Sequence, residues 1–400
     1  GKIDISNRTI TGSGTAAGDD VISFGGVEQP DVADIAIAGL GDDQVNARSG
    51  GLFLLGDNGE IKVNALGMSA LRSYSQGPTD GPSRDKISKM VDSIVSANLA
   101  ADGDDTVTMA ETGFLRGVTG GGDDTVELSA GISYVLADDG TLTITSTTVK
   151  LVSAQSLNAG DDKVTSYATT DLIVGGAGND SIALGYGDDV VLGDGGTIEV
   201  KTLSGVTTTT VTTDADAFGN DTVTADAGAS GAKTVLLGLG NDKANLGDTG
   251  SFVLGDNGQA TLKGGAWLGN TSGATGGKDD ITTGSGIDII LAGLGNDTVD
   301  AGDGANVIIA DTGTFTKDKI VSAFTATDGD DSITAGTGQD RVILGGGADM
   351  ANLGDGDNRV LGDSGTIDWT VLLEEYVQSS DVISGGADSI FTGLGLDLML

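Results

Sequence analysis

The sequence has no cysteine and no histidine, and it has few prolines. Without cysteine the chain can form neither a disulfide framework nor a thiolate metal site, and it has no cysteine nucleophile. Without histidine a Ser-His-Asp triad cannot be assembled. The three prolines, Pro30, Pro78 and Pro82, lie in stretches that we interpret as insertions. Proline is therefore kept out of the regular segments, as hydrogen-bonded strands require.

Positive charge is also scarce. The chain has 20 Lys and Arg residues against 59 Asp and Glu residues, which gives a formal net charge of −39. Because the basic residues are few and scattered, we do not expect a nucleic-acid partner. No stretch approaches the roughly 18 consecutive apolar residues of a membrane span, so no membrane span is expected. Residues 1–5 show no apolar region of a cleavable signal peptide.

Glycine and aspartate dominate what is present. There are 69 glycines, and only seven of the 59 acidic residues are glutamate. Asp is the shorter carboxylate and suits tight turns that ligate an ion. A chain this acidic and glycine-rich could be disordered. However, 38% of the residues are apolar and fall at fixed offsets from the Asp-bearing loops. The sequence therefore predicts a chain that folds once counter-ions compensate its charge.

A nine-residue pattern, Gly-Gly-x-Gly-x-Asp-x-apolar-x, runs through the chain. Its clearest copy is residues 175–183, and residues 184–192 follow as the next unit. Tandem nonapeptides of this type predict a parallel β-roll, in which each unit is a glycine-rich loop and a three-residue strand with an inward apolar side chain. Glycine adopts positive φ, so loop carbonyls and a carboxylate can converge on one ion. In these residues the chain resembles the RTX family, the calcium-binding repeat proteins of bacterial type I secretion.

The resemblance implies an all-β fold, a right-handed parallel β-roll or β-solenoid that binds Ca²⁺ in Gly/Asp-rich turns. It also implies export of an unfolded chain from low-calcium cytosol and folding outside the cell. The apolar strand positions are then expected to form core ladders: Ile182, Val191, Val299, Ile308, Ile333, Val342 and Val360.

A turn signature, Gly/Ala-Asp-x-Gly, recurs six times at longer spacing. Its aspartates are Asp57, Asp138, Asp194, Asp256, Asp311 and Asp363. Another loop aspartate lies upstream of each of these, always at the same offset, at Asp43, Asp124, Asp180, Asp242, Asp297 and Asp349. So constant an offset indicates a rigid unit, which we interpret as two or three turns of a solenoid followed by a hairpin-like excursion.

The sequence thus predicts one continuous β-solenoid over residues 1–400, built from about seven super-repeats. Their bounds are 1–58, 59–139, 140–195, 196–257, 258–312, 313–364 and a partial copy at 365–400. Residues 64–88 are predicted to be a surface insertion. Residues 84–99 have helix-like apolar spacing, but alignment of the super-repeats favours a strand in their second half. Because the sequence stops within a repeat, we expect a segment of a longer array.

Two nonapeptides make one coil of such a roll, so loops separated by two units stack on the same edge. We predict a Ca²⁺ ion between each of three pairs with this spacing: Asp162 with Asp180, Asp279 with Asp297, and Asp331 with Asp349. Carboxylates and loop carbonyls would supply six to eight oxygens at about 2.3–2.6 Å. The signature residues Asp194, Asp311 and Asp363 fall on the same edge and would extend the column.

The opposite edge carries Asp189, Asp288 and Asp340. Because the next turn of the solenoid supplies Asn306 or Asn358 in two cases, we expect these sites to be weaker or absent. The remaining candidate ligands are Asp20, Asp43, Asp57, Asp105, Asp124, Asp138, Asp221, Asp242, Asp256, Asp388 and Asp397. The separation of Asp20 from Asp43, like that of Asp221 from Asp242, exceeds two nonapeptide units, which leaves their pairing open.

We do not expect an enzyme. The acid pair Glu374-Glu375 is interpreted as a solvated strand edge rather than a glycosidase centre. Trp267 and Trp369 lie in excursions, where they either anchor a partner or cover the apolar edge of the roll. The expected role is an extracellular calcium-binding structural or adhesive segment, such as an adhesin stalk or a subunit of a surface layer or filament.

The expected partners are calcium ions, neighbouring repeats or other copies of the chain, and a cell-surface or carbohydrate ligand. Two alternatives remain. One is a repeat or secretion module attached to an RTX-like enzyme or toxin, and the other is a carbohydrate- or ice-binding module.

Overall fold

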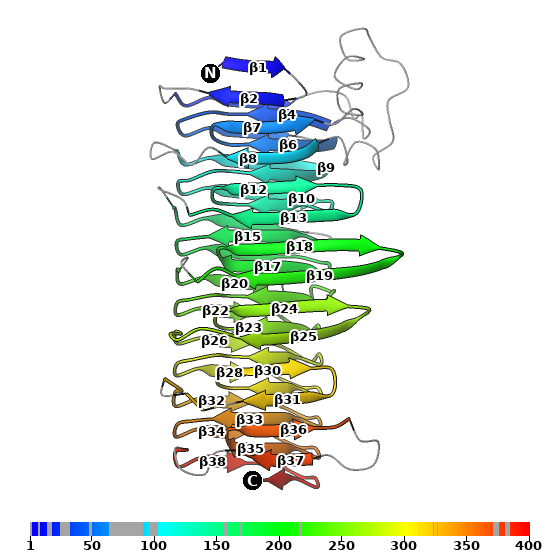
Figure 1. Cartoon of the computed structure of the whole chain (residues 1–400), viewed down its shortest axis with the longest axis vertical. Coiled ribbons are helices and arrows are strands. Elements are labelled where there is room, and N and C mark those ends of the chain that lie inside the picture. The colour runs from blue at the N-terminus through cyan, green and yellow to red at the C-terminus, as the bar shows by residue number, and fades with distance from the viewer. Residues whose placement is uncertain are drawn as a thin grey trace. The chain divides into compact units, whose positions relative to one another are not determined.

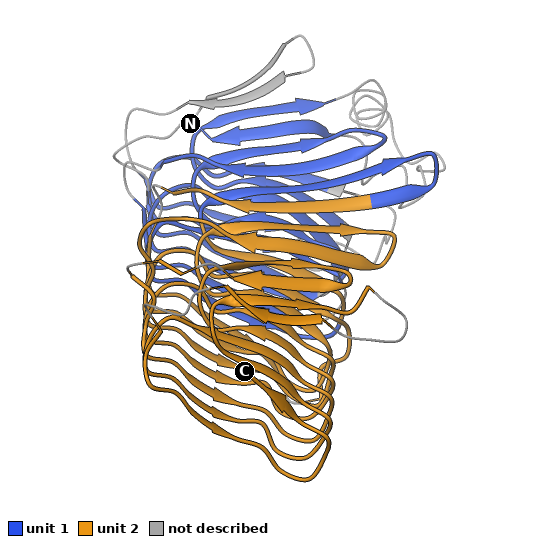
Figure 2. Cartoon of the chain, turned by 60° about the horizontal axis from the view of Figure 1, so that its bottom comes forward, with its two compact units in different colours: residues 1–186, 195–207 blue, residues 187–194, 208–400 orange. Residues whose placement is uncertain are grey.

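The structure is a computed structural model, and it divides into two compact units (Figure 2). Unit 1 comprises Gly1–Tyr186 and Gly195–Thr207, and unit 2 comprises Gly187–Asp194 and Thr208–Leu400. The described residues are 2–6, 9–13, 18–24, 33–47, 50–63, 91–96, 103–155, 159–167, 170–215, 218–226, 228–322, 324–325, 327–370, 376–380 and 385–400. Every regular element in these ranges is a β-strand. They contain no helix long and apolar enough to cross a membrane.

Unit 1 contains three sheets, which we call A, B and C. Sheet B is parallel and consists of β3 (Val21–Phe24), β5 (Gln44–Ala47), the first part of β9 (Thr106–Val118), β10 (Thr125–Ala130), β14 (Lys163–Ser166) and β16 (Ser181–Leu184). Sheet C is parallel and consists of β4 (Ala33–Ile37), β6 (Gly50–Leu55), the second part of β9, β11 (Tyr134–Leu136) and β15 (Leu172–Gly176). Sheet A is antiparallel and consists of β1 (Lys2–Ser6), β2 (Thr9–Ser13), β7 (Gly59–Val63), β8 (Val91–Ser96), β12 (Gly140–Ile144), β13 (Thr148–Ser153) and β18 (Gly196–Leu203).

Unit 2 repeats this arrangement. Its sheet B consists of β20 (Thr222–Ala225), β22 (Lys243–Asn245), β26 (Asp280–Thr282), β28 (Thr298–Asp300), β32 (Ser332–Thr334), β34 (Met350–Asn352) and β38 (Ser389–Phe391). Its sheet C consists of β17 (Asp189–Asp194), β21 (Lys233–Leu236), β23 (Ser251–Leu254), β27 (Ile289–Leu291), β29 (Val307–Ile309), β33 (Arg341–Gly345), β35 (Arg359–Asp363) and β39 (Leu398–Met399). Its sheet A consists of the unit 2 part of β19 (Val206–Thr213), β24 (Gly258–Lys263), β25 (Ala266–Thr271), β30 (Gly313–Thr316), β31 (Lys319–Ser322), β36 (Gly365–Asp368) and β37 (Tyr376–Ser379).

Most coils of the roll contribute one strand to sheet B and one to sheet C, whereas β9 runs through both sheets, and successive coils stack in register. Val299 of β28 pairs with Ile333 of β32 in sheet B, while Ile308 of β29 pairs with Val342 of β33 in sheet C. All seven predicted core positions are buried, from 0% to 1% exposed. The predicted β-roll with inward apolar ladders is therefore confirmed.

Sheets B and C differ in how many faces they bury. Strands of sheet B bury only alternate residues, as in the exposed-buried-exposed pattern of Thr298–Asp300. Most strands of sheet C are buried along all or nearly all of their length, as in Leu172–Gly176 and Ser251–Leu254. A parallel strand covered on both faces reads as a continuous apolar run rather than an alternating one. Sheet C therefore lies between sheet B and sheet A.

Sheet A is made of the predicted hairpin-like excursions (Figure 1). Its strands β7, β12, β18, β24, β30 and β36 begin at the last glycine of the six turn signatures. β8 shows that residues 91–96 form a strand, as the super-repeat alignment favours, and not a helix. The rest of 84–99, the insertion 64–88, the three prolines and Glu374-Glu375 lie outside the described residues. The seven super-repeat bounds stay a prediction.

Large side chains of sheet A cover sheet C in unit 2. Trp267 stacks on Phe252 with a centroid distance of 4.8 Å, and Phe315 meets the same ring edge-on at 6.2 Å. Trp369 lies beneath the Arg341 guanidinium, 4.7 Å from its ring centroid. Of the two roles considered for Trp267, the contact with Phe252 supports covering the apolar roll.

Candidate metal sites

Aspartates line the turns that lead into the strands of sheet B, which we call edge 1. In unit 1 each of them donates its backbone N–H to the Oδ1 of the equivalent aspartate in the next coil. The donor–acceptor pairs are Asp20–Asp43, Asp43–Asp105, Asp105–Asp124, Asp124–Asp162 and Asp162–Asp180, at 2.7–2.9 Å. Asp20 and Asp43, whose pairing the sequence leaves open, are therefore stacked neighbours.

Unit 2 has the same ladder at edge 1. Its pairs are Asp221–Asp242, Asp242–Asp279, Asp279–Asp297, Asp297–Asp331, Asp331–Asp349 and Asp349–Asp388, at 2.7–3.1 Å. All three aspartate pairs that the sequence predicts to share an ion are therefore stacked neighbours. Asp221 also pairs with Asp242, although 21 residues separate them.

The second carboxylate oxygen of these residues is the feature that suits a cation. In unit 1 the Oδ2 atoms of Asp43, Asp105 and Asp162 are buried without a hydrogen-bond partner. The same holds in unit 2 for Asp242, Asp279, Asp297, Asp331 and Asp349. A buried carboxylate oxygen without a partner is strongly unfavourable, and a bound cation is the usual compensation.

The pKa values of the ladder reflect this environment. Burial and the Asp124 carboxylate raise the pKa of Asp105 to about 9. Burial and the carboxylates of Asp297 and Asp242 raise the pKa of Asp279 to about 10. Burial and the Asp311 carboxylate likewise raise the pKa of Asp331 to about 10. Without a metal these groups therefore favour the protonated form at neutral pH.

The signature aspartates reach the same edge from the end of sheet C. In unit 1 the Asp138 Oδ2 accepts the N–H of Ala177 at 2.8 Å. Burial, and to a smaller extent the charge of Asp180, raise the pKa of Asp138 to about 8. In unit 2 Asp311 accepts the N–H of Gly346 at 2.7 Å, close to Asp349.

The other signature aspartates make equivalent contacts. Asp57 accepts from Gly121, Asp194 from Leu239 and Asp256 from Gly277, while Asp363 lies beside Gly385 and Asp388. The structure thus places the signature residues on edge 1, as the sequence predicts for Asp194, Asp311 and Asp363.

Beside the ladder, carboxylate and carbonyl oxygens converge on glycines that have no room for a side chain. A Cβ placed on Gly56 would lie 2.2 Å from Asp105 Oδ2 and 2.1 Å from the Thr119 carbonyl oxygen. A Cβ on Gly255 would lie 2.4 Å from Asp279 Oδ2 and 2.0 Å from the Ala292 carbonyl oxygen. Carboxylate and carbonyl oxygens are the ligands that Ca²⁺ takes. In the described ranges no three acidic side chains form a preformed metal cluster, so carbonyls would complete each site.

Edge 2, the turns from sheet B into sheet C, carries a more mixed column. In unit 2 Asp288 donates its N–H to Asn306 Oδ1 at 3.1 Å, Asp340 donates to Asn358 Oδ1 at 3.0 Å, and Asn358 donates to Asp397 Oδ1 at 3.0 Å. Asp189 lies in the same column and is paired with Lys233. Neutral amides therefore alternate with carboxylates, as the sequence predicts for this edge.

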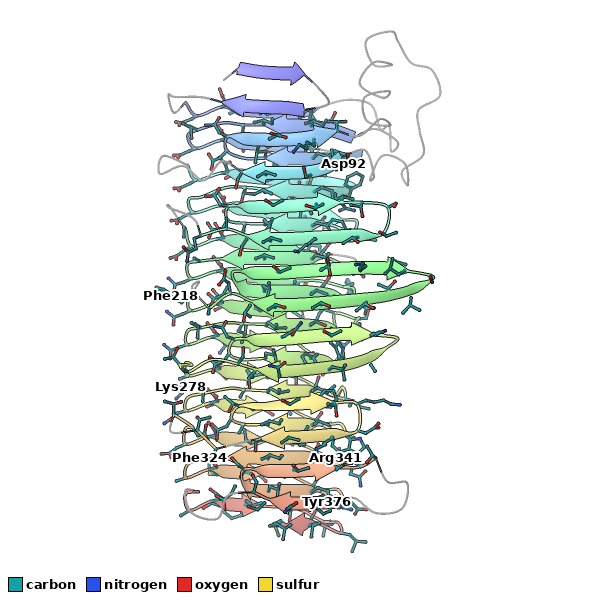
Figure 3. The ribbon with its side chains drawn as sticks, viewed as in Figure 1. Asp92, Phe218, Lys278, Phe324, Arg341 and Tyr376 are labelled. Carbon is teal, nitrogen blue, oxygen red and sulfur yellow. The ribbon has the colours of Figure 1, made fainter. Side chains whose placement is uncertain are left out.

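Sequence reasoning missed an outer column beside edge 1. In unit 1 a second series of hydrogen bonds starts at Asp42. Each further member donates its backbone N–H to the side-chain Oδ1 of the member before it, at 2.8–3.2 Å, in the order Asp104, Asp123, Asp161 and Asn179. In unit 2 the same position carries Asn220, Asn241 and Lys278, and Lys278 lies on the outer side of the edge (Figure 3). The signal was present, since most of these loops in unit 1 contain an Asp-Asp doublet.

Sequence reasoning also missed Lys233 and Arg116, two buried cations at edge 2. Burial lowers the pKa of Arg116 to about 10, against the opposing influence of Tyr134 and Asp171. Neither residue belongs to the nonapeptide pattern, so no spacing rule could point to it.

Acidification is expected to restore part of the fold when calcium is absent. The folded pKa values of about 7 to 10 for Asp297, Asp331 and Asp279 exceed the ordinary value of 3.8, so the metal-free fold binds more protons than the unfolded chain. Its stability is then greatest near pH 4 and falls as pH rises toward 10. Circular dichroism of calcium-free protein should show more β-structure at pH 5 than at pH 8. A pH-independent spectrum would contradict the burial of these carboxylates.

Comparison with known proteins agrees with this geometry. Residues 165–197, 274–313 and 324–351 match the family described as RTX calcium-binding nonapeptide repeat (4 copies). The matched stretches include Asp180, Asp279, Asp297, Asp331 and Asp349 of the edge 1 ladders. No curated protein and no solved structure matches the chain.

Proposed function

Because this chain carries RTX calcium-binding nonapeptide repeats, we propose that it is an extracellular structural or adhesive segment that folds when it binds Ca²⁺. RTX repeats are typical of secreted bacterial proteins. The observation that carries the proposal is the pair of edge 1 ladders, in which buried Asp Oδ2 atoms face carbonyl oxygens of neighbouring coils. Each ion would join two coils, so metal binding and coil stacking would be one equilibrium.

In this role, the aspartates of edge 1 would both join neighbouring coils and bind the ions. The Asp Oδ1 atoms hold the preceding coil by accepting its N–H groups. The Oδ2 atoms, the signature carboxylates and loop carbonyls would supply oxygens to Ca²⁺. The ions would cancel much of the net charge of −39. The resulting stack of coils presents long, regular sheet faces, which suits a non-catalytic stalk, surface layer or filament.

Two other roles are compatible with calcium-binding repeats. A module attached to a secreted enzyme or toxin would be supported by a catalytic domain encoded next to these residues, and more repeats on both sides would argue against it. A carbohydrate- or ice-binding module would be supported by retention of the calcium-loaded chain on a polysaccharide or on ice. The regular ladders favour the structural role over both.

Replacing one buried ladder carboxylate tests the proposal. In Asp279→Asn the amide keeps the side-chain shape but removes a charge from a fully buried ligand position. The calcium concentration at the folding midpoint should rise several-fold, measured by circular dichroism during a calcium titration. Asp280→Asn is the matched control, because the adjacent Asp280 is about half exposed and pairs with Lys243 at the surface.

Light scattering recorded in the same titration addresses the biological role. Growth of scattering at the folding midpoint would favour a surface-layer or filament subunit, and a constant monomer signal would favour a stalk. Equal calcium midpoints for Asp279→Asn, Asp280→Asn and the wild type would overturn the assignment of edge 1 as the calcium site.

A further inference from the structure

Lys233 occupies a position in edge 2 where the other coils of unit 2 place Asp, Asn or Ser. Strand register sets it opposite Asp189 on one side and opposite Ser251 on the other. From Ser251 onward, the residue at this position in each coil donates its backbone N–H to the side-chain Oδ1 of the equivalent residue in the next coil. The successive acceptors are Asp288, Asn306, Asp340, Asn358 and Asp397. Lys233 departs from this pattern and brings a positive charge into the column.

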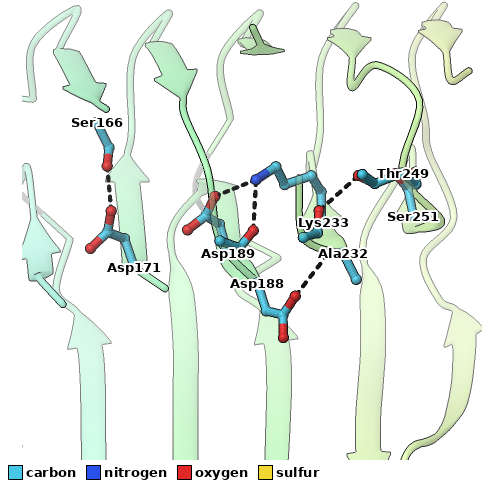
Figure 4. Close-up of polar contacts among 10 residues, drawn as sticks. Ser166, Asp171, Asp188, Asp189, Ala232, Lys233, Thr249 and Ser251 are labelled. Atoms are coloured by element: carbon cyan, nitrogen blue, oxygen red, sulfur yellow. Dashed lines mark hydrogen bonds and ion pairs between the residues drawn. The ribbon is translucent and has the colours of Figure 1, made fainter. Parts of the chain in front are cut away.

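The Lys233 ammonium is bound as a small cation would be. Its Nζ donates to Asp189 Oδ2 at 2.7 Å and to the Gly187 carbonyl oxygen at 2.7 Å (Figure 4). The side chains of Lys233 and Asp189 are 0% and 1% exposed. A carboxylate oxygen and a loop carbonyl oxygen are the ligands that a hard divalent cation takes. A lysine ammonium is a compact charge that can bind the same oxygens.

The backbone around this pair is joined independently of any ion. Gly187 donates to the Ser230 carbonyl at 2.6 Å, and Asp189 donates to the Ala232 carbonyl at 3.1 Å. Ala232 in turn donates to Asp188 Oδ1 at 2.9 Å. The turn before β17 and the turn before β21 therefore hold each other by backbone bonds as well as by a buried ion pair.

A protein cation also appears at edge 2 of unit 1. Arg116 is 5% exposed, and its Nη1 donates to the Leu115 carbonyl at 2.9 Å and to the Ile132 carbonyl in the turn before β11. Its guanidinium lies 3.7 Å from the centroid of the Tyr134 ring. In both units, then, a basic side chain binds a turn carbonyl at edge 2.

We propose that the Lys233 ammonium takes the place of a metal ion at edge 2, so that β17 and β21 stay joined without calcium and provide the point from which calcium-driven folding of unit 2 spreads. The proposal rests on the proposed function, because it assigns calcium to the other coils. A buried carboxylate requires a compensating charge, and at Asp189 the chain itself supplies it.

Amide hydrogen exchange of the full chain in calcium-free buffer tests the proposal. In the wild type, exchange in β17 and β21 should be at least about 100-fold slower than in β29 and β33, as expected for strands held by a buried ion pair. Lys233→Ser gives this position the residue found at Ser251 and opens the space to an ion. It should lose the protection of β17 and β21 without calcium, regain it in saturating calcium, and bind an additional Ca²⁺ per chain by calorimetric titration.

Two further variants keep the result interpretable. Lys243→Ser is the control, because Lys243 pairs with Asp280 at 2.8 Å with both side chains about half exposed, and its exchange pattern should equal the wild type. Lys233→Met preserves side-chain length without the charge. It should lose protection of β17 and β21 in calcium-free buffer even if the serine variant does not fold.

Three outcomes would overturn the proposal. One is that, without calcium, β17 and β21 of Lys233→Met are protected from exchange as well as they are in the wild type. Another is a calcium-free wild type in which β17 and β21 exchange as fast as β29 and β33, which would leave the proposed function intact. If all strands of the wild type stay protected without calcium, the proposed function fails together with this inference.

Discussion

Calcium removal should abolish most of the fold. We expect calcium-free protein at neutral pH to give the circular dichroism spectrum of a largely unfolded chain, and added Ca²⁺ to restore β-structure cooperatively. In unit 1 the ladder from Asp43 to Asp180 is buried. Coils stack about 4.8 Å apart, so two adjacent carboxylates that stayed ionised would repel each other by about 3–4 kcal/mol at an effective dielectric constant of 20. Protonating them instead also costs free energy at neutral pH, because Asp in the unfolded chain is ionised there. No covalent cross-link opposes this repulsion, because the chain has no cysteine.

Magnesium is the appropriate control for this transition. Mg²⁺ requires near-octahedral geometry at about 2.0–2.1 Å and loses its water reluctantly, so it should not replace Ca²⁺ in sites built partly from carbonyl oxygens. Sodium chloride at matched ionic strength controls for screening. A spectrum that is unchanged by chelation would leave a metal-free solenoid with Asp-rich turns.

Gly295→Ala should be among the most destabilising single substitutions in unit 2. Gly295 has φ +129°, and a Cβ there would lie 1.6 Å from the Gly277 carbonyl oxygen of the neighbouring coil. The clash lies in the same loops as the Asp279–Asp297 ladder bond. Backbone strain and overpacking together should cost about 3–5 kcal/mol. Chemical unfolding in saturating calcium measures this as a lower denaturant midpoint, accompanied by a higher calcium midpoint for folding.

Gly265→Ala separates the two causes. Gly265 is at the end of the β24–β25 hairpin with φ +80°, and nothing lies within 4 Å of an added Cβ. Only the left-handed backbone opposes alanine there, at a cost of about 1–2 kcal/mol. Equal destabilisation by the two substitutions would mean that the coils do not approach each other as closely at Gly295 as the structure shows.

The parts of the fold that could be predicted from the sequence are those that follow from the regular nine-residue repeat. The nonapeptide spacing placed Val299 and Ile333 in the core and stacked Asp279 on Asp297, because a fixed coil length fixes which side chains coincide. The Asp221–Asp242 pair shows where this rule ends. The segment from Asp221 to Lys233 is longer than the equivalent segment from Asp279 to Asp288, so the edge 2 turn before β21 absorbs the extra length.

Features set by contacts between layers could not be predicted from spacing. The continuous apolar runs of sheet C, such as Leu172–Gly176, become intelligible only once sheet A is seen to cover their second face. The role of Lys233 depends on its register with Asp189, which strand pairing across 44 residues determines. Lys233 does not recur at the repeat spacing, so the sequence pattern gives no indication of its partner. Only the folded structure shows that this partner is Asp189.

The unequal hairpins of sheet A bear on how such a chain avoids misfolding. A coil that slipped by one repeat would still set aspartate on aspartate and valine on valine, so the parallel sheets discriminate weakly between correct and shifted pairings. Some hairpins differ in length: in unit 2, β24 and β25 have six residues each, whereas β30 and β31 have four. A shifted register would leave backbone groups of the longer strands unpaired. Sheet A thus reduces the degeneracy that repetition creates, because hairpins of different length cannot exchange places without losing hydrogen bonds.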